Sequence, residues 1–354
     1  MNMEKQVAYF RRLSNADVYA ETLRSGGIAL TRLEYEMEQD DIDRVLAAAQ
    51  GYQLQAYSQE AVQHGYGADR ALIARCPNLL AVSTPGSGYD AVNLADCTAA
   101  GVLVVNQAGL HATAVAQHAL GMMLCLSKKI IQAHTAMHGD ADWSRLDYGG
   151  HDIDGKVLGV AGFGAVGRRL AEICGGAFGM RVITHHPRMS DADIRACGAE
   201  PVAFDAMLGQ ADFVVAALPL TDQTRRLFGA REFALMKPGA YFVTVARGGI
   251  HDEAALAAAL RRGEIAGAGL DVWEVEPPPA DHPLLAFPNV LTTPHNAGMT
   301  AESRLRVSRG AAAQWLTIFE GKRPPRLLNP DVWPRYVDRY ARIMGQPPEE
   351  HAEP

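Results

Sequence analysis

Two kinds of hydrophobic pattern alternate along the second half of the chain. From residue 157 onward, short apolar runs rich in β-branched residues are separated by amphipathic stretches. The runs predict strands at 157–161, 181–184, 213–217, 241–245, 266–270 and 290–292. Helices are predicted at 191–197 and 253–262, because Ser190 and Asp252 can cap their first turns. This alternation predicts a parallel sheet covered by helices on both faces.

The segment before residue 110 has an α/β pattern of its own. Strands are predicted at 28–30, 53–56, 79–83 and 102–105, around a helix at 42–49. A long helix is predicted at 301–320, ending at Gly321, and we expect it to return the chain to this first unit. The predicted fold class is therefore α/β, with two Rossmann-like domains, doubly wound parallel sheets, and the second domain inserted into the first.

Composition limits the kind of protein this can be. The chain has 354 residues, 48% of them hydrophobic, which is enough for two cores. Its 33 basic and 40 acidic residues give a net charge of -7 without a basic stripe, which argues against a nucleic-acid partner. The apolar stretch 112–127 contains polar residues and meets Lys128, so we interpret it as a buried helix rather than a membrane span.

The cysteines and the N-terminal residues indicate a reducing compartment. No two cysteines have the spacing of a metal or redox pair, so we expect free, mostly buried thiols and no metal site. They are Cys76, Cys97, Cys125, Cys174 and Cys197. Residues 1–12 are mostly polar or charged and lack the apolar centre of a secretory signal. We therefore expect a cytoplasmic protein.

A glycine-rich turn follows the first strand of the second half. Gly162, Gly164 and Gly167 have the spacing G-x-G-x-x-G, and a helix is expected to begin near Ala165. Such a turn lets the backbone approach a pyrophosphate, whose charge rests on the N-terminus of the helix. The motif alone is weak, because glycine turns also arise for steric reasons. The preceding strand and the following helix favour the nucleotide-binding interpretation.

Three ionisable residues downstream could carry chemistry. Arg247 could hold a carboxylate, while Glu276 and His295 could move a proton. Together with a dinucleotide site, these groups point to hydride transfer. Each also has a structural interpretation: a strand-end cap for Arg247, a loop charge for Glu276 and a turn residue for His295. Four other histidines are expected at surface or packing positions: His118, His185, His251 and His282.

Four segments together resemble the D-isomer-specific 2-hydroxyacid dehydrogenases. They are the glycine-rich segment 155–167, Val-Ala-Arg-Gly-Gly at 245–249, Gly-Leu-Asp-Val-Trp-Glu-Val-Glu-Pro at 269–277, and Thr-Pro-His at 293–295. The likeness is good over about residues 79 to 321 and loose before them. It implies hydride transfer between a nicotinamide cofactor and a small 2-keto acid, which becomes an (R)-2-hydroxy acid.

The resemblance also implies roles for the residues. His295 becomes the general acid/base, Arg247 the carboxylate anchor and Glu276, rather than Glu274, the partner that orients the imidazole. The loop 83–90 would offer backbone N–H groups of Ser87 and Gly88 to the substrate carboxylate. The implied cofactor contacts are Gly162, Gly164, Ala165, Val166, Gly167, His186, Arg188, Leu218, Pro219, Thr224, Ala246 and Asp271.

The resemblance gives the two predicted domains their functions. Residues 1–109 and 297–345 would form a discontinuous substrate domain, and residues 110–296 the dinucleotide-binding domain. The Pro- and Glu-rich segment 346–354 is expected to be disordered.

The chain departs from the NAD-preferring pattern at the end of the second strand of the nucleotide domain. Those relatives place an acidic residue there, whereas this strand ends Thr-His-His-Pro-Arg at 184–188. No carboxylate would repel a 2′-phosphate, and Arg188 or a protonated His186 could attract one. We expect NAD or NADP as cofactor, with NADP accepted or preferred. The alternative is that these side chains face solvent and NAD binds through the rest of the cleft.

Two further alternatives concern the class of protein. A nucleotide-sensing corepressor or scaffold could keep the dehydrogenase fold and act by binding partners. A formate dehydrogenase is disfavoured, because its relatives place glutamine where Glu276 stands. By the resemblance, the apolar surface of 115–131 predicts a homodimer contact, with an intramolecular core helix as the alternative. The expected partners are thus a small 2-keto or 2-hydroxy acid and a second copy, with no nucleic acid and no membrane.

Overall fold

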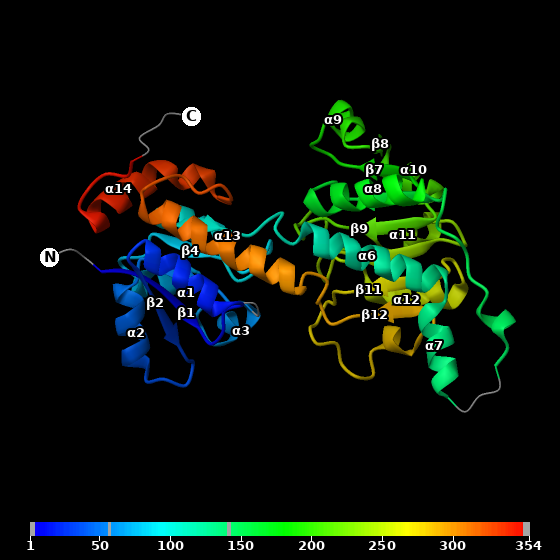
Figure 1. Cartoon of the computed structure of the whole chain (residues 1–354), viewed down its shortest axis with the longest axis horizontal. Helices are drawn as coiled ribbons and strands as arrows, with labels where there is room; N and C mark the ends of the chain where they lie inside the picture. The colour runs from blue at the N-terminus through cyan, green and yellow to red at the C-terminus, as the bar shows by residue number, and fades with distance from the viewer. Residues whose placement is uncertain (1–3, 56–57, 140–142, 350–354) are drawn as a thin grey trace. The chain divides into compact units, whose positions relative to one another are not determined.

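The computed structural model describes residues 4–55, 58–139 and 143–349 and divides into two compact units (Figure 1). Unit 1 comprises Met1–His111 and Ala301–Pro354, and unit 2 comprises Ala112–Thr300. Unit 2 therefore interrupts unit 1 in the sequence, which confirms the predicted insertion. Of the tail predicted to be disordered, residues 350–354 lie outside the described residues.

Unit 2 contains a seven-stranded parallel sheet in the order β12-β11-β10-β9-β6-β7-β8. Its strands are β6 (Val157–Ala161), β7 (Arg181–His185), β8 (Glu200–Pro201), β9 (Phe213–Ala216), β10 (Tyr241–Thr244), β11 (Gly267–Leu270) and β12 (Val290–Thr292). The predicted strands are confirmed with ends shifted by at most one residue. Strand order reverses between β6 and β9, and in open parallel sheets such a switch point is where ligands bind.

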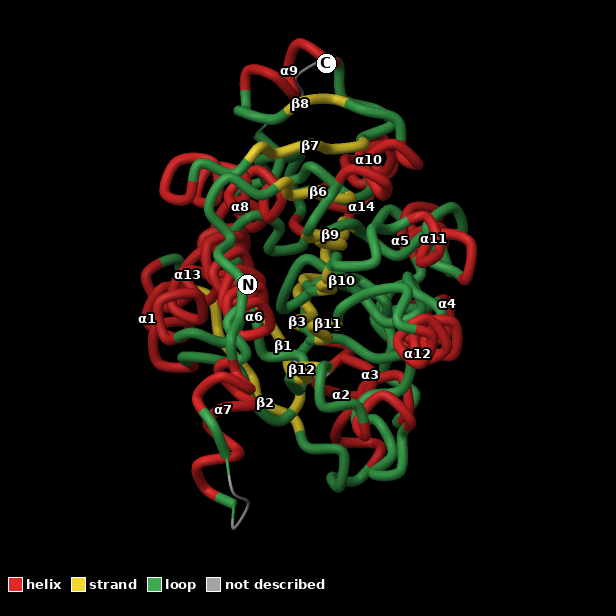
Figure 2. The backbone as a smooth tube through the Cα atoms, turned by 90° about the vertical axis from the view of Figure 1, so that its right-hand side faces the viewer, coloured by secondary structure: helices red, strands yellow, loops and turns green. Residues whose placement is uncertain are grey.

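Helices cover both faces of this sheet, as Figure 2 shows. On one face α6 (Ala112–Ser127) and α8 (Ala165–Phe178) share a core with β6. The opposite face is packed by α10 (Phe204–Gln210), α11 (Ala230–Leu235) and α12 (Glu253–Arg262). The remaining short helices are α7 (Ile130–His138), η1 (Arg145–Tyr148), α9 (Asp191–Ala196) and η2 (Pro283–Ala286).

Unit 1 has a five-stranded parallel sheet in the order β2-β1-β3-β4-β5. Its strands are β1 (Lys5–Phe10), β2 (Ile28–Leu33), β3 (Gly51–Gln53), β4 (Ala81–Ser83) and β5 (Leu103–Val105). The predicted strand at 53–56 was placed too late, because the buried pairing begins at Gly51. The sequence analysis missed β1, since its polar start, Lys5 and Gln6, hides the four buried residues that follow.

The last two long helices complete unit 1. Unit 1 has two hydrophobic cores. One core contains side chains of α1 (Ala16–Ser25), α13 (Ala301–Phe319), η3 (Pro330–Val332) and α14 (Trp333–Met344). The other contains side chains of α2 (Gln39–Ala48), α4 (Arg70–Arg75) and α5 (Leu94–Ala100), and the short helix α3 spans Ser58–Gln63. The Trp315 indole N–H lies 3.1 Å from the Tyr19 hydroxyl and 3.2 Å from Gln53 Oε1. These bonds tie the returning helix to α1 and β3.

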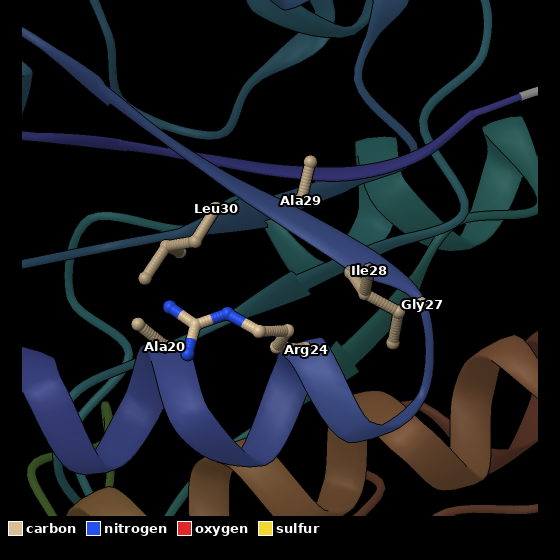
Figure 3. A pocket seen from close by; sticks show the side chains of 6 residues that line it. All are labelled: Ala20, Arg24, Gly27, Ile28, Ala29 and Leu30. Atoms are coloured by element: carbon tan, nitrogen blue, oxygen red, sulfur yellow. The ribbon is translucent and has the colours of Figure 1, made fainter.

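A hollow of about 330 Å³ lies in unit 1 between α1 and β2 (Figure 3). Its lining residues are Ala20, Arg24, Gly27, Ile28, Ala29 and Leu30, and Figure 3 shows the Arg24 side chain between Ala20 and Leu30. Arg24 is the only charged residue among these six. None of the predicted site residues lines this hollow, so it does not contribute to the site described below.

His251 is fully buried in the core of unit 2. Its ring lies 5.7 Å from that of Phe242, and neither ring nitrogen has a hydrogen-bond partner among the described residues. Burial lowers the pKa of His251 to about 4, partly opposed by Asp252 and assisted by His282. The imidazole is therefore neutral near pH 7, and its unpaired polar atoms cost on the order of 1–3 kcal/mol.

We expect the His251→Leu variant to unfold with less sensitivity to acid. The unfolded histidine binds its proton near the ordinary pKa of 6.5 and the folded one only near 4. The folded state therefore loses stability as the pH falls between these values, by about 3 kcal/mol in total. Urea unfolding at pH 7.5, 5.5 and 4.5 measures this loss, with exposed His138→Leu as the control. Equal acid sensitivity in wild type and His251→Leu would contradict the assignment.

Candidate active site

The glycine-rich turn after β6 leaves a backbone surface open beside the switch point. Gly162 has φ of +94°, and a Cβ there would lie 2.6 Å from the Ala217 carbonyl oxygen, so only glycine fits. A Cβ on Gly164 would meet nothing within 4 Å. Helix α8 begins at Ala165, and the Arg168 N–H donates to the Gly164 carbonyl. The N–H groups of the residues before Arg168, including that of Val166, lie in the first turn, where the helix itself offers no acceptor. These features fit a bound pyrophosphate.

The loop after β9 forms the neighbouring wall of this turn. The Ala217 N–H donates to the Ala161 carbonyl at 2.8 Å, which holds the two strand ends together. Thr224 Oγ1 donates to the Pro219 carbonyl at 2.6 Å and accepts from the Thr221 N–H at 2.7 Å. The Thr224 side chain therefore closes its own loop, and Leu218 flanks Gly162.

The end of β7 carries a cluster of cationic and imidazole groups. The Arg188 N–H donates to His186 Nδ1 at 3.3 Å. Burial, followed by the charges of Arg188, His185 and Arg168, lowers the pKa of His186. His186 is thus neutral near pH 7 in this environment, contrary to the protonated form considered above. The electrostatic partner that the sequence analysis missed is Arg168, which the first turns of α8 bring toward β7.

Arg247 follows β10, and its neighbour Gly248 fixes where it lies. A Cβ on Gly248 would fall 1.7 Å from the Trp273 carbonyl oxygen, so the loops after β10 and β11 touch through their backbones. The Arg247 Nη1 donates to the carbonyl of buried Ala246 at 2.8 Å, and its charge acts on Glu276. Backbone contact between adjacent strand ends therefore places the guanidinium near the carboxylate.

Glu276 and His295 form the closest polar contact of the site. Glu276 Oε2 lies 2.7 Å from His295 Nδ1, and Glu276 Oε1 accepts the Trp273 N–H at 3.1 Å. Partial burial alone would raise the pKa of Glu276, but the bond and charge of His295, the Trp273 N–H and Arg247 outweigh it and lower the pKa. Glu276 is therefore ionised. Because it contacts the imidazole at Nδ1, the other ring nitrogen of His295, Nε2, can bond to another partner.

The turn that carries His295 is fixed from behind by Asp271. His295 has φ of 54°, in the left-handed region that side chains other than glycine rarely adopt. Asp271, which is 1% exposed, accepts the N–H of Asn296 at 2.9 Å and that of Ala297 at 3.1 Å. It also accepts the Thr293 hydroxyl at 2.6 Å. The carboxylate predicted to contact the cofactor therefore makes three bonds to the turn that carries His295.

His118 contributes to the same network, although the sequence analysis placed it among surface or packing residues. Its Nε2 lies 3.1 Å from Thr293 Oγ1 and 3.7 Å from Asp271 Oδ1. Helix α6, which carries His118, packs on β10, β11 and β12. Because α6 is far from Thr293 in the sequence, no local motif could reveal this contact.

The predicted substrate loop belongs to unit 1 and follows β4. The Gln107 N–H donates to the Gly86 carbonyl at 2.8 Å, and the Asn106 side chain donates to the Ser87 carbonyl at 2.9 Å. Ser87 is exposed and Gly88 is half-buried. The loop is thus held through its carbonyl oxygens, an arrangement that suits presentation of N–H groups to an anion.

A glycine cradle at a Rossmann switch point, with an arginine and a carboxylate-bound histidine in the loops that follow three neighbouring strands, is the arrangement of a nicotinamide-dependent dehydrogenase. Residues 120–297 match the family described as D-isomer specific 2-hydroxyacid dehydrogenase, NAD binding domain. Among the described residues, no helix combines the length and apolar character needed to cross a bilayer.

Known proteins extend this similarity over most of the chain. A glyoxylate reductase of Aeropyrum pernix is 39% identical over 273 residues, 75% of this chain and 80% of that protein. The glyoxylate/hydroxypyruvate reductase B of Citrobacter koseri is 36% identical, over 74% and 82% of the two chains. A glyoxylate reductase structure from Paecilomyes thermophila superimposes with a TM-score of 0.79 at 28% identity, over 92% and 99%.

The chain belongs to the D-isomer-specific 2-hydroxyacid dehydrogenase family. It is an oxidoreductase that transfers a hydride between a nicotinamide cofactor and a 2-keto acid or its (R)-2-hydroxy acid. The comparisons give no support to the corepressor or scaffold alternative.

Proposed function

We propose that this enzyme reduces short 2-keto acids of the glyoxylate and hydroxypyruvate kind, with His295 as general acid. The observation that carries the proposal is the 2.7 Å contact between His295 Nδ1 and the ionised Glu276, next to Arg247. Relatives named glyoxylate reductase and glyoxylate/hydroxypyruvate reductase support the substrate class.

The roles follow from what a 2-keto acid requires. The nicotinamide supplies the hydride. Arg247 binds the substrate carboxylate and the carbonyl oxygen, which gains negative charge as hydride reaches carbon. His295 donates the proton at Nε2 to that oxygen, and accepts it back in the oxidative direction. Glu276 favours the protonated ring and fixes its orientation.

The two units divide the remaining tasks in this proposal. Unit 2 binds the dinucleotide along the glycine-rich turn, the Leu218–Pro219 wall and Asp271. Unit 1 acts as the substrate domain, where the N–H groups of Ser87 and Gly88 receive the carboxylate. The hydrogen bonds that anchor this loop support the assignment, since the carbonyl oxygens of Gly86 and Ser87 accept them and the N–H groups of Ser87 and Gly88 take no part in them.

A panel of 2-keto acids tests the reaction and its acid. Glyoxylate and hydroxypyruvate should be turned over at least about tenfold more efficiently than phenylpyruvate. His295→Ala should lower kcat by about 10²- to 10⁴-fold, the usual contribution of a general acid, while fluorescence titration shows unchanged cofactor binding. Exposed His134→Ala on α7 is the control and should retain full activity. An unimpaired His295→Ala variant would refute the role of His295 as general acid. A wild type that is inactive on every 2-keto acid tested would instead favour the corepressor alternative.

We also propose that NADP(H) is preferred, through Arg168 and Arg188. Within the part of the chain that the structure describes, neither forms an ion pair with a carboxylate, and both are exposed beside His186. Two guanidinium groups around the site of the ribose 2′-phosphate would bind it with charge-assisted hydrogen bonds.

Replacing either arginine by alanine should lower kcat/KM with NADPH by about tenfold or more, with little effect for NADH. Arg181→Ala is the matched control, because Arg181 lies on β7, the strand that precedes Arg188, but pairs with Glu200. A wild-type preference of a hundredfold for NADH would overturn this proposal.

A second copy of the chain is the proposed partner of the α7 region. Most of the apolar face of α6 is buried inside unit 2, so the exposed apolar surface begins only at the end of the predicted stretch 115–131 and extends beyond it. It consists of the side chains of Ile130, Ile131, Met137, Trp143 and Leu146, each at least 43% exposed. Helix α7 has no buried residue of its own. A surface of this kind fits a homodimer contact.

Sedimentation equilibrium should give the mass of a dimer, and Leu146→Glu should shift it toward the monomer. Val62→Glu, at an exposed valine of unit 1, is the control and should leave the dimer intact. A monomeric wild type at micromolar concentration would exclude the homodimer.

We propose a cytoplasmic location for the enzyme, since its five free thiols suit a reducing compartment, and cell fractionation checks this.

A further inference from the structure

The hydrogen bonds behind the catalytic turn have a direction that the donor inventory determines. Ionised Asp271 can only accept, so the single hydroxyl proton of Thr293 points to it across 2.6 Å. Thr293 Oγ1 must then accept from His118, which lies 3.1 Å away, so His118 Nε2 carries a proton. Donation therefore runs from His118 to Thr293 to Asp271.

This chain of bonds ends on the backbone that positions His295. Asp271 uses Oδ1 for Thr293 and Asn296, and Oδ2 for Ala297. A buried carboxylate is costly unless its lone pairs are satisfied, and here the donors belong to the turn itself. Asp271 therefore links the left-handed conformation of His295 to side chains on α6 and at the end of β12.

We propose that Thr293 and His118 are positioning residues for the general acid, acting through Asp271 on the 295–297 turn. The proposal rests on the proposed function of His295. The hydroxyl of Thr293 keeps Asp271 aimed at the turn, and His118 keeps that hydroxyl aimed at Asp271. With the turn fixed, the imidazole stays within hydrogen-bond distance of Glu276. Neither residue touches the reacting atoms in this role.

The charged and titratable groups around the imidazole determine the sign of the expected effect. Glu276 contacts the ring directly, Arg247 at the end of β10 acts on Glu276, and Asp271 and His118 lie behind the turn. The carboxylate of Glu276 favours the protonated ring. When the turn loosens, that contact weakens and the ring loses its proton at lower pH. Keto-acid reduction needs the protonated ring, so the pH above which the rate of reduction falls also moves to a lower value.

The central test compares Thr293→Val, which removes the hydroxyl at nearly constant volume, with Thr293→Ser, which keeps it. Thr293→Val should lower kcat by about ten- to hundredfold, the scale of one hydrogen bond to a charged group, with KM and cofactor affinity changed less than about threefold. It should move the alkaline limit of reduction to lower pH, as Glu276→Gln should. Thr293→Ser should restore both.

The matched control is Thr244→Val. Thr244 is also fully buried at a strand end of unit 2, but its hydroxyl has no partner among the described residues. This variant should leave kcat and the pH profile unchanged. Loss of activity in Thr244→Val equal to that in Thr293→Val, or failure of serine to rescue, would overturn the proposal. A second pair of variants repeats the comparison at His118. His118→Leu removes the N–H donor, as Thr293→Val removes the hydroxyl, whereas His118→Gln keeps an N–H donor.

A readout without turnover separates this inference from the proposed function. Proton NMR of the His295 ring in the cofactor-free protein, assigned with His295→Ala, follows its titration directly. The midpoint should fall in Thr293→Val and in Glu276→Gln, and should be restored in Thr293→Ser. If the enzyme turns over no 2-keto acid but these midpoints move as stated, the positioning role holds and the proposed function fails. An unmoved midpoint in folded Thr293→Val refutes the positioning role.

Discussion

The parallel pairing of β10, β11 and β12 is the constraint on which the site depends. These strands are neighbours in the sheet and point the same way, so their carboxyl ends meet at one edge. The backbone contact of Gly248 with Trp273 joins the first two loops, and the contact of Glu276 with His295 joins the last two. Hydrogen-bonded sheet geometry therefore brings together three side chains that are distant in the sequence.

Two carboxylates serve this edge in different ways because their surroundings differ. Glu276 is 38% exposed and touches the imidazole, where its negative charge favours the protonated ring. Asp271 is 1% exposed and accepts three hydrogen bonds from the turn that carries His295, so its contribution is geometric. The same functional group thus provides electrostatic support at one position and backbone order at the other.

Sequence patterns predicted the parts of the molecule that depend on local physics. The buried strands of unit 2 are continuous apolar runs, whereas β1 opens with Lys5 and β8 has only two residues, too few for a pattern. Motif spacing pointed to Arg247, Glu276 and His295. It could not reveal the contact of His118 with Thr293, which joins residues 175 positions apart, nor the burial and the approach of Arg168 that help to lower the pKa of His186. Both arise only when helices pack on the finished sheet.

The steric requirement at Gly248 has an evolutionary consequence. The atom that excludes a side chain there is a backbone oxygen, which Trp273 or any replacement for it would present equally. No single compensating substitution can therefore create the missing space, and variation at position 248 would require rebuilding the whole loop after β11. Directed evolution of this enzyme should find position 248 closed to change, while exposed Val275 two residues beyond Trp273 remains open to it.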